Sequence, residues 1–246
     1  MFELKEKQYF GPNGITANFL LRRNTADENT ITATYTEDEY KFAGFRPQPG
    51  DWMIDGGGYV GSTAILYAQL FPLAKIITIE PLPENADLIR KNIERNHLQD
   101  RIILIEGALW SVSGQKVKIY YRDTSEVGKV HKFVGSGFKQ YHETVAEDHA
   151  EVNTVSLNDI ITRYHIHRIR VLKMDIEGAE YEAVKGLSLS DKLMIQTMVG
   201  EYHNIFPGLV GDPRTQLYEP LKNIFDDKSP GPEVKTWGAF LFERKT

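Results

Sequence analysis

Ile54-Asp55-Gly56-Gly57-Gly58-Tyr59-Val60-Gly61 and Ile76-Ile77-Thr78-Ile79-Glu80-Pro81 are the two segments that indicate the architecture of this chain. The first stretch is an apolar strand that ends in an acid and a glycine-rich turn. A helical pattern follows over 62–70, and the second stretch is another apolar strand that ends in an acid. This order predicts a βαβ unit with a nucleotide-type pocket at the carboxyl edge of a parallel sheet. The glycines let the backbone approach a ligand, and Glu80 lies where a carboxylate accepts ribose hydroxyls.

The glycine-rich turn also argues against some ligands. It lacks the Gly-Lys-Ser/Thr of a phosphate-binding loop. Gly56, Gly58 and Gly61 satisfy the dinucleotide pattern G-x-G-x-x-G, but three consecutive glycines satisfy many patterns. Asp55 would repel a pyrophosphate and favours a cationic or hydroxyl-rich ligand. S-adenosylmethionine has an amino group, a sulfonium and a ribose but no phosphate. We therefore predict it as the cofactor and keep an NAD-dependent dehydrogenase as the alternative.

Composition narrows the class of protein. The chain has 246 residues, enough for one α/β domain with a small extension, and a net charge of -5, which argues against a nucleic-acid partner. It has no cysteine, which excludes disulfides, thiolate zinc sites and a cysteine nucleophile. No apolar run approaches the ~20 residues of a membrane span, and residues 1–7 lack the apolar core of a signal peptide. We expect a cytoplasmic protein without a membrane partner.

Two regions are expected along the chain. Residues 1–50 form a β-rich extension with β-branched or apolar runs over 15–21 and 30–35, and residues 51–246 form the main domain. Ser156 is the predicted N-cap of a helix, and Gly186 is predicted to end a later one. A further helix is predicted over 84–95. The strands predicted for the main domain cover 52–54, 75–79, 102–105, 117–121, 152–155, 170–175, 193–199 and 236–244.

The stretch 122–151 interrupts the alternation of strands and helices. It has few aliphatic residues and several glycines, and such a stretch inside a compact domain is often a lid or binding loop. A disordered insertion is the alternative. If the stretch is a lid, its candidate substrate contacts are His131, Tyr141, His142 and His149.

Acidic residues occur at the predicted carboxyl ends of five strands. They are Asp55, Glu80, Glu106, Asp175 and Glu201, the last followed closely by His203. Ligands of open α/β sheets bind at this edge. One such acid is ordinary because acids cap helix N-termini, but five exceed what capping requires. The sequence therefore predicts an acidic pocket that favours a cationic ligand.

These motifs resemble the FkbM-type S-adenosylmethionine-dependent methyltransferases. The similarity begins with 54–61, continues through 80–85, 92–96 and 107–114, and is most specific in 152–159 followed by 172–180. It implies a Rossmann-like class I methyltransferase fold, a seven-stranded mostly parallel sheet with an antiparallel last strand. It also implies methyl transfer to a hydroxyl of a small molecule, such as a sugar or a natural-product intermediate. The family usually has Ala-Asn where this chain has Gly58-Tyr59.

The resemblance suggests roles for the cofactor residues. Gly57 and Gly61 let the loop wrap the methionine part, and Asp55 holds the amino group directly or through water. Glu80 accepts the ribose hydroxyls. Glu106, Gly107 and Ala108 line the adenine, with a solvent-facing strand end as the alternative for Glu106. The full predicted cofactor set is Asp55, Gly57, Gly58, Tyr59, Gly61, Glu80, Pro81, Glu106, Gly107, Ala108 and Asp175.

Methyl transfer to a hydroxyl needs alignment of the reacting atoms and removal of a proton. Asp175 is the first candidate base, because in this fold the strand that it ends faces the transferred methyl. His203 is the second candidate, because the ordinary pKa of histidine, about 6.5, suits proton transfer near neutral pH. Glu201 lies two residues earlier, on the same face if the strand continues. Alternatively, these three residues form an oxygen-rich metal site. A methyltransferase-like binding protein without catalysis is a further alternative.

The sequence leaves the acceptor and the oligomeric state open. Acceptor selectivity is expected in the extension, in 122–151 and in 204–213, which carry the fewest motifs. The aromatic residues Phe2, Tyr9 and Phe10 mark a homodimer interface or a flap if they are exposed. Otherwise they pack the extension onto the main domain.

Overall fold

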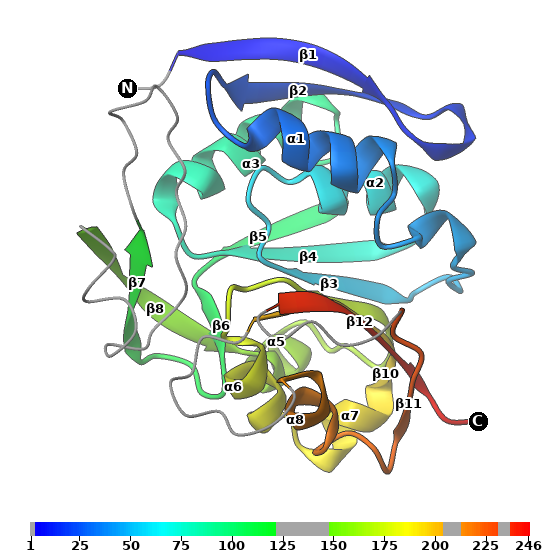
Figure 1. The fold of residues 1–246 in the computed structure, drawn as a ribbon. Coiled ribbons are helices and arrows are strands. Elements are labelled where there is room, and N and C mark those ends of the chain that lie inside the picture. Colours follow the sequence, from blue (N-terminus) through cyan, green and yellow to red (C-terminus); the bar gives the residue numbers. More distant parts are fainter. Residues whose placement is uncertain (1–2, 122–147, 204–212, 231–236) are drawn as a thin grey trace.

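A computed structural model describes residues 3–121, 148–203, 213–230 and 237–246. Its centre is a seven-stranded sheet in the order β11-β12-β10-β9-β3-β4-β5 (Figure 1). Strand β12 runs antiparallel to β10, whereas β10, β9, β3, β4 and β5 are mutually parallel. This confirms the predicted Rossmann-like fold with an antiparallel last strand. The strands are β3 (Trp52–Gly56), β4 (Lys75–Glu80), β5 (Ile102–Glu106), β9 (Ile169–Met174), β10 (Ile195–His203), β11 (Phe225–Asp227) and β12 (Trp237–Arg244).

Helices cover both faces of this sheet (Figure 1). Helices α2 (Ser62–Leu70) and α3 (Pro83–Arg95) lie on one face, and α5 (Leu157–Arg163), α6 (Glu180–Lys185), α7 (Leu189–Met194) and α8 (Pro213–Tyr218) lie on the other. Every residue of β3 is buried, as expected for a central parallel strand whose sequence is nearly continuously apolar. The sheet therefore separates two apolar cores.

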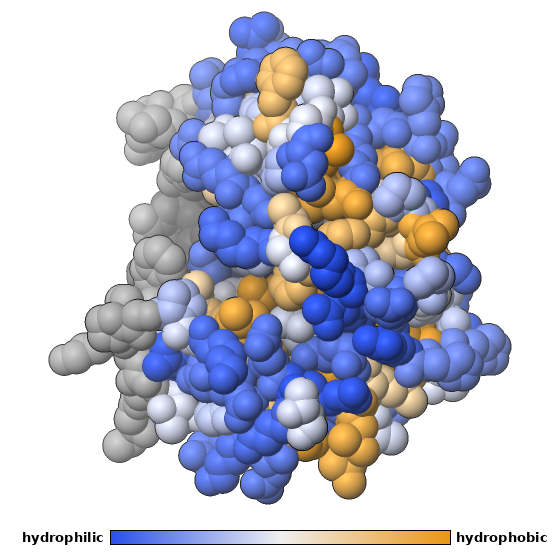
Figure 2. All heavy atoms as spheres, turned by 90° about the vertical axis from the view of Figure 1, so that its right-hand side faces the viewer, coloured by the Kyte–Doolittle hydropathy of each residue, from blue (hydrophilic) through white to orange (hydrophobic). Residues whose placement is uncertain are grey.

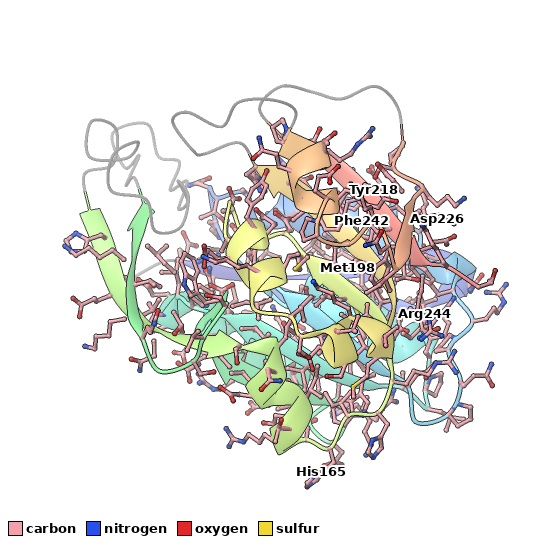
Figure 3. All side chains as sticks on the ribbon, turned by 90° about the horizontal axis from the view of Figure 1, so that it is seen from below. His165, Met198, Tyr218, Asp226, Phe242 and Arg244 are labelled. Carbon is pink, nitrogen blue, oxygen red and sulfur yellow. The ribbon has the colours of Figure 1, made fainter. Side chains whose placement is uncertain are left out.

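The second core shows how the last strand is fixed. Met198 of β10 and Phe242 of β12 are register partners, and both are fully buried. The ring of Tyr218 from α8 lies 5.2 Å from that of Phe242, so the helix packs over the strand pair (Figure 3). Apolar side chains of β10, β12 and α8 thus hold the antiparallel strand in place.

The N-terminal extension begins with a β-hairpin of β1 (Leu4–Phe10) and β2 (Thr16–Arg22), and β2 covers most of the apolar run noted over 15–21. The prediction of a strand over 30–35 was wrong, because α1 (Asp27–Ile31) and a π-helical turn (Thr32–Thr36) cover these residues. Asp27, Ile31 and Tyr35 are fully buried at a spacing of four, which suits a helix. The Thr34 hydroxyl donates to the carbonyl of Thr30, one helical turn earlier, so its polar group is satisfied within the helical segment.

The hairpin is attached to α3 by side-chain amides. Asn92 accepts from the Leu20 N–H at 2.7 Å and donates to the carbonyls of Leu20 and Val60. Tyr9 is buried against Phe19 with ring centres 5.7 Å apart, so it packs within the extension. Phe10 is exposed, and Phe2 lies outside the described residues. The boundary at residue 50 stays a prediction.

A small second sheet follows β5 and joins β6 (Ala108–Trp110), β8 (Asp148–Ser156) and β7 (Lys116–Tyr121) in that order. The predicted strand 117–121 therefore belongs to this sheet. Residues 148–151 were wrongly assigned to the lid, because they continue the strand predicted from 152 and pair with β7. The rest of 122–151 lies outside the described residues, including His131, Tyr141 and His142.

Caps define two helix boundaries on the second face. Ser156 caps α5 by accepting from the Asp159 N–H, as predicted. The prediction of a strand from 193 was wrong by two residues, because Leu193 and Met194 are the last residues of α7. A capping box of Ser188 and Asp191 stabilises the N-terminus of this helix. Among the described residues, no helix combines the length and apolar composition that crossing a membrane requires. The face seen in Figure 2 is mainly hydrophilic, with apolar side chains in small groups.

Candidate active site

A cavity of about 330 Å³ lies at the carboxyl ends of the parallel strands. Its size is within the range of small-molecule sites, roughly 300–1,000 Å³. The wall combines the glycine turn after β3, the end of β4, the start of β6 and the turn after β9 with part of the N-terminal extension. Eight residues of the predicted cofactor set line it: Gly57, Gly58, Tyr59, Glu80, Pro81, Gly107, Ala108 and Asp175.

The turn after β3 requires glycine at position 57. Gly57 has a φ of +81°, and a Cβ there would lie 2.0 Å from the carbonyl oxygen of Asp175. The N–H groups of Gly57 and Gly58 both donate to the Ile79 carbonyl at 3.0 Å. The backbone of the turn thus packs closely against the ends of β4 and β9, and without side chains at these glycines it lines the cavity directly.

Glu80 is held by three donors at the end of β4. Its Oε2 accepts from the Tyr59 N–H at 2.8 Å, and its Oε1 accepts from the Leu82 N–H at 3.0 Å and the Asn85 amide at 3.1 Å. A carboxylate accepts about four hydrogen bonds, so one lone-pair position is left for a ligand hydroxyl. Burial raises the pKa of Glu80 to about 7, against the effect of these donors.

Asp55 is fully buried and does not line the cavity. Its Oδ2 accepts from the Thr78 hydroxyl at 2.9 Å, and its Oδ1 lies 3.3 Å from Nζ of Lys173. Lys173 also donates to the carbonyls of Gly56 and Gly57 at 3.1 and 2.9 Å. Asp55 therefore contacts the cation that braces the turn, and its direct bond to a cofactor amino group stays a prediction.

Two other residues of the predicted cofactor set lie outside the cavity lining. Glu106 is exposed and its carboxylate pairs with Arg90 of α3, so the structure places it as a solvent-facing strand end. Gly61 has a φ of +84° where α2 begins. Apolar side chains of Leu109 and Ile119 line the cavity beside Gly107 and Ala108. This part of the wall suits a flat apolar ring such as adenine.

His203 lies at the centre of an acidic cluster. Its Nδ1 is 3.1 Å from Oε1 of Glu180, and its Nε2 is 3.6 Å from Glu177, 3.7 Å from Glu201 and 4.0 Å from Asp175. Of these, Asp175 and Glu177 line the cavity, whereas Glu201 and His203 do not. The structure therefore brings the three predicted catalytic residues together and adds Glu177 and Glu180, which are not among the predicted site residues.

The carboxylates around His203 favour its protonated, positively charged form. Burial alone would lower the pKa of His203, but its bond to Glu180 and the surrounding carboxylates raise it to about 10. Burial, with charge repulsion from Asp175, raises the pKa of both Glu177 and Glu201. At neutral pH His203 is thus protonated. Within the described chain, the ligand atoms of Asp175, Glu177 and His203 lie within 4.8 Å of one another, so these residues, rather than the predicted set with Glu201, could hold a divalent cation.

The N-terminal extension supplies residues that sequence analysis missed. The Tyr40 hydroxyl donates to Oδ2 of Asp175 at 3.2 Å, and Tyr40, Glu39, Thr30 and Thr34 all line the cavity. Nothing in their local sequence marks them. Lys173 carried a signal, because it is the one charged residue within the apolar run 171–174.

Comparisons with known proteins agree with this geometry. The family model described as "Methyltransferase FkbM domain" matches residues 55–216. Methyltransferase sdnD from Sordaria araneosa is 21% identical over 82% of this chain and 80% of its own length. The 31-O-demethyl-FK506 methyltransferase FkbM from Streptomyces tacrolimicus is 25% identical over 72% and 75%.

A solved structure shares the fold at low identity. The putative rRNA-methylase from Clostridium thermocellum aligns with a TM-score of 0.50 at 11% identity, over 85% of this chain and 94% of its own. The sheet order, the cavity at the glycine turn and the family match over more than half of the sequence lead to one conclusion. The chain belongs to the FkbM family of S-adenosylmethionine-dependent methyltransferases.

Proposed function

We propose that this protein transfers the methyl group of S-adenosylmethionine to a hydroxyl of a small molecule, with Asp175 as the base. The observation that carries this proposal is the position of Asp175. Its carboxylate lies on the cavity wall next to the glycine turn and is held by the Tyr40 hydroxyl at 3.2 Å. A carboxylate held beside the donor site can take the proton of an attacking hydroxyl.

The cofactor supplies an electrophilic methyl group on a positively charged sulfur. The chain's contribution is to bind the rest of that molecule and to exclude water. Glu80 offers a hydrogen-bond acceptor for the ribose, and the backbone of Gly57 and Gly58 forms the adjoining wall. The carboxylate of Asp175, with the acceptor oxygens of Glu39 and Glu177 on the same wall, suits a sulfonium.

In the proposed step the acceptor oxygen forms a bond to the methyl carbon while the carbon–sulfur bond breaks. The hydroxyl proton passes to Asp175, and S-adenosylhomocysteine leaves as a neutral thioether. His203 is protonated at neutral pH, so it serves by offsetting the charge of Asp175 rather than by accepting the proton.

A hydroxyl acceptor is supported by the chemistry of the outer wall and by relatives. Thr30, Thr34 and Glu39 offer hydroxyl and carboxylate groups that pair with an alcohol or polyol. The relative from Streptomyces tacrolimicus is named for 31-O-demethyl-FK506, a substrate described by a missing O-methyl group. A stretch of 76 residues is 33% identical to catechol O-methyltransferase from Sus scrofa. Family membership favours methyl transfer over the dehydrogenase that the glycine pattern had left open.

Calorimetric titration with S-adenosylhomocysteine tests the cofactor, with NAD as the control ligand. We expect binding by the wild type, a large loss in Glu80→Ala, and no binding of NAD. Methylation of a panel of hydroxyl compounds then tests the base. Asp175→Asn should abolish turnover while keeping the affinity for S-adenosylhomocysteine, whose sulfur carries no charge, and Asp87→Asn, at an exposed site on α3, should change neither. NAD binding, or full turnover by Asp175→Asn, would overturn the proposal.

A further inference from the structure

A closed ring of hydrogen bonds joins the N-terminal extension to the cofactor pocket. Its members come from five separate elements: Arg22 from β2, Asp27 from α1, Tyr59 from the glycine turn, Glu80 from the end of β4 and Asn85 from α3. Tyr59, Glu80 and Asn85 line the cavity. The ring therefore connects a hairpin on the outside of the domain with the carboxylate assigned to the ribose.

Each link of this ring is a direct contact. The Tyr59 hydroxyl donates to Oδ1 of Asp27 at 2.7 Å, and Asp27 accepts from Nη2 and Nε of Arg22 at 2.8 and 2.9 Å. Arg22 Nη1 donates to the Asn85 carbonyl oxygen at 2.8 Å. The Asn85 amide donates to Glu80, and the Tyr59 backbone N–H closes the ring on the other carboxylate oxygen of Glu80.

Burial makes these contacts hard to replace by water. Arg22 is 4% exposed, Asp27 0%, Asn85 3% and Glu80 4%. An arginine can only donate, so Arg22 fixes the Asn85 side chain with its oxygen toward the guanidinium and its NH₂ toward Glu80. The guanidinium also lies 5.2 Å from the centre of the Tyr59 ring. Arg22 and Asp27 thus determine which atoms face Glu80.

Tyr59 needs such an anchor because of its backbone. Its φ of +50° lies in the left-handed region, which is uncommon for a bulky side chain. In that conformation its N–H donates to Glu80 at 2.8 Å. The bond from the phenol to Asp27 holds the residue from its far end, so side chain and backbone are fixed together.

We propose that Tyr59, Asp27 and Arg22 are positioning residues for the methyl donor, which hold Glu80 so that its remaining acceptor position faces the ribose. This inference rests on the proposed function. The N-terminal extension would then belong to the cofactor site, in addition to supplying Thr30, Thr34 and Glu39 to the wall that faces the acceptor. The Tyr59 hydroxyl would also have a task that phenylalanine cannot perform.

Removal of one hydroxyl tests the proposal. Tyr59→Phe should raise the Kd for S-adenosylhomocysteine about tenfold or more, as expected for the loss of a bond to a charged acceptor. Tyr67→Phe is the matched control, because the Tyr67 hydroxyl is buried, lies outside the cavity lining and has no hydrogen-bond partner among the described residues. A merely structural role would lower the melting temperature and leave the Kd of the folded protein unchanged, and this result would overturn the proposal.

A second variant separates two possible causes of a change in Kd, namely the loss of the Tyr59 hydroxyl and the strain of its left-handed backbone. Asparagine tolerates the left-handed conformation better than tyrosine but is too short to reach Asp27. Tyr59→Asn should therefore raise the Kd at least as much as Tyr59→Phe, and wild-type affinity would contradict the proposal.

Hydrogen exchange on the wild type does not depend on how the variants fold. Because coupling is reciprocal, S-adenosylhomocysteine should slow exchange at the amides of 20–31. Unchanged exchange there, in a protein that binds the ligand, would overturn the inference alone. No binding by the wild type would overturn the proposed function.

Discussion

Replacement of Lys173 by methionine should destabilise the protein more than almost any other single substitution. The Lys173 side chain is 4% exposed and that of Asp55 is 0% exposed, with Nζ and Oδ1 3.3 Å apart. At an effective dielectric constant of ~20, their attraction is about 5 kcal/mol. Lys173→Met would leave the Asp55 charge buried without its partner, which costs about 3–5 kcal/mol.

A variant with both residues replaced shows how much of this loss comes from the unpaired charge of Asp55. Asp55→Asn with Lys173→Met removes both charges, so most of the loss should return. About 1–3 kcal/mol should remain, because the carbonyls of Gly56 and Gly57 lose their donor. Lys185→Met serves as the control, since that side chain is 73% exposed and its ion pair with Glu182 should contribute less than about 1 kcal/mol.

Chemical denaturation followed by circular dichroism measures these differences, and a thermal scan supports them. For a domain of this size, a loss of about 3–5 kcal/mol lowers the melting temperature by roughly 6–20 °C. A Lys173→Met protein within about 1 kcal/mol of the wild type, or a double variant as unstable as the single one, would refute the assignment of Lys173 and Asp55 as a mutually dependent pair.

Four further outcomes are expected. Gly57→Ala should abolish S-adenosylhomocysteine binding, whereas Gly114→Ala, which has a similar φ of +79° but no atom within 4 Å of the new Cβ, should keep it. Because the pKa of Glu80 is about 7 and the ionised form accepts the ribose hydroxyls, the Kd measured by calorimetry should be about tenfold weaker at pH 6 than at pH 8, and a flat profile would contradict this role. The raised pKa of His203 adds stability that is complete below about pH 6.5 and is lost toward pH 10, so unfolding experiments should show the wild type losing its advantage over His203→Asn as pH rises. Turnover should persist in EDTA, since protonated His203 supplies the positive charge at the cluster; activity that requires added Mg²⁺ would instead indicate a metal at Asp175, Glu177 and His203.

Local patterns in the sequence were sufficient for six of the seven strands of the central sheet and for the centre of the cofactor site, whereas β11 was not predicted. Strands 52–56, 75–80 and 169–174 appear as apolar runs because they are buried on both faces. The acids Glu80 and Asp175 follow two of these runs, and the carboxyl ends of parallel strands meet at one edge. Neighbouring positions along the chain therefore predicted neighbouring positions in space.

Other residues of the site could not be identified from local sequence. Tyr40, Glu39 and Thr30 line the cavity only because the extension folds over α3, which brings residues far apart in sequence together. The same packing made 30–35 helical, since burial of Ile31 and Tyr35 outweighs the β propensity of the threonines.

The ionisation of the site was decided by tertiary structure alone. His203 looked like a base with an ordinary pKa, but Glu180, Glu177 and Glu201 surround it and keep it protonated. Glu106 occupies an equivalent strand end yet faces solvent beside Arg90. The order of strands and acids along the chain was enough to predict which residues lie at the edge of the sheet. Only the folded chain decided which of them are buried together, and burial with neighbouring charge is what sets their chemistry.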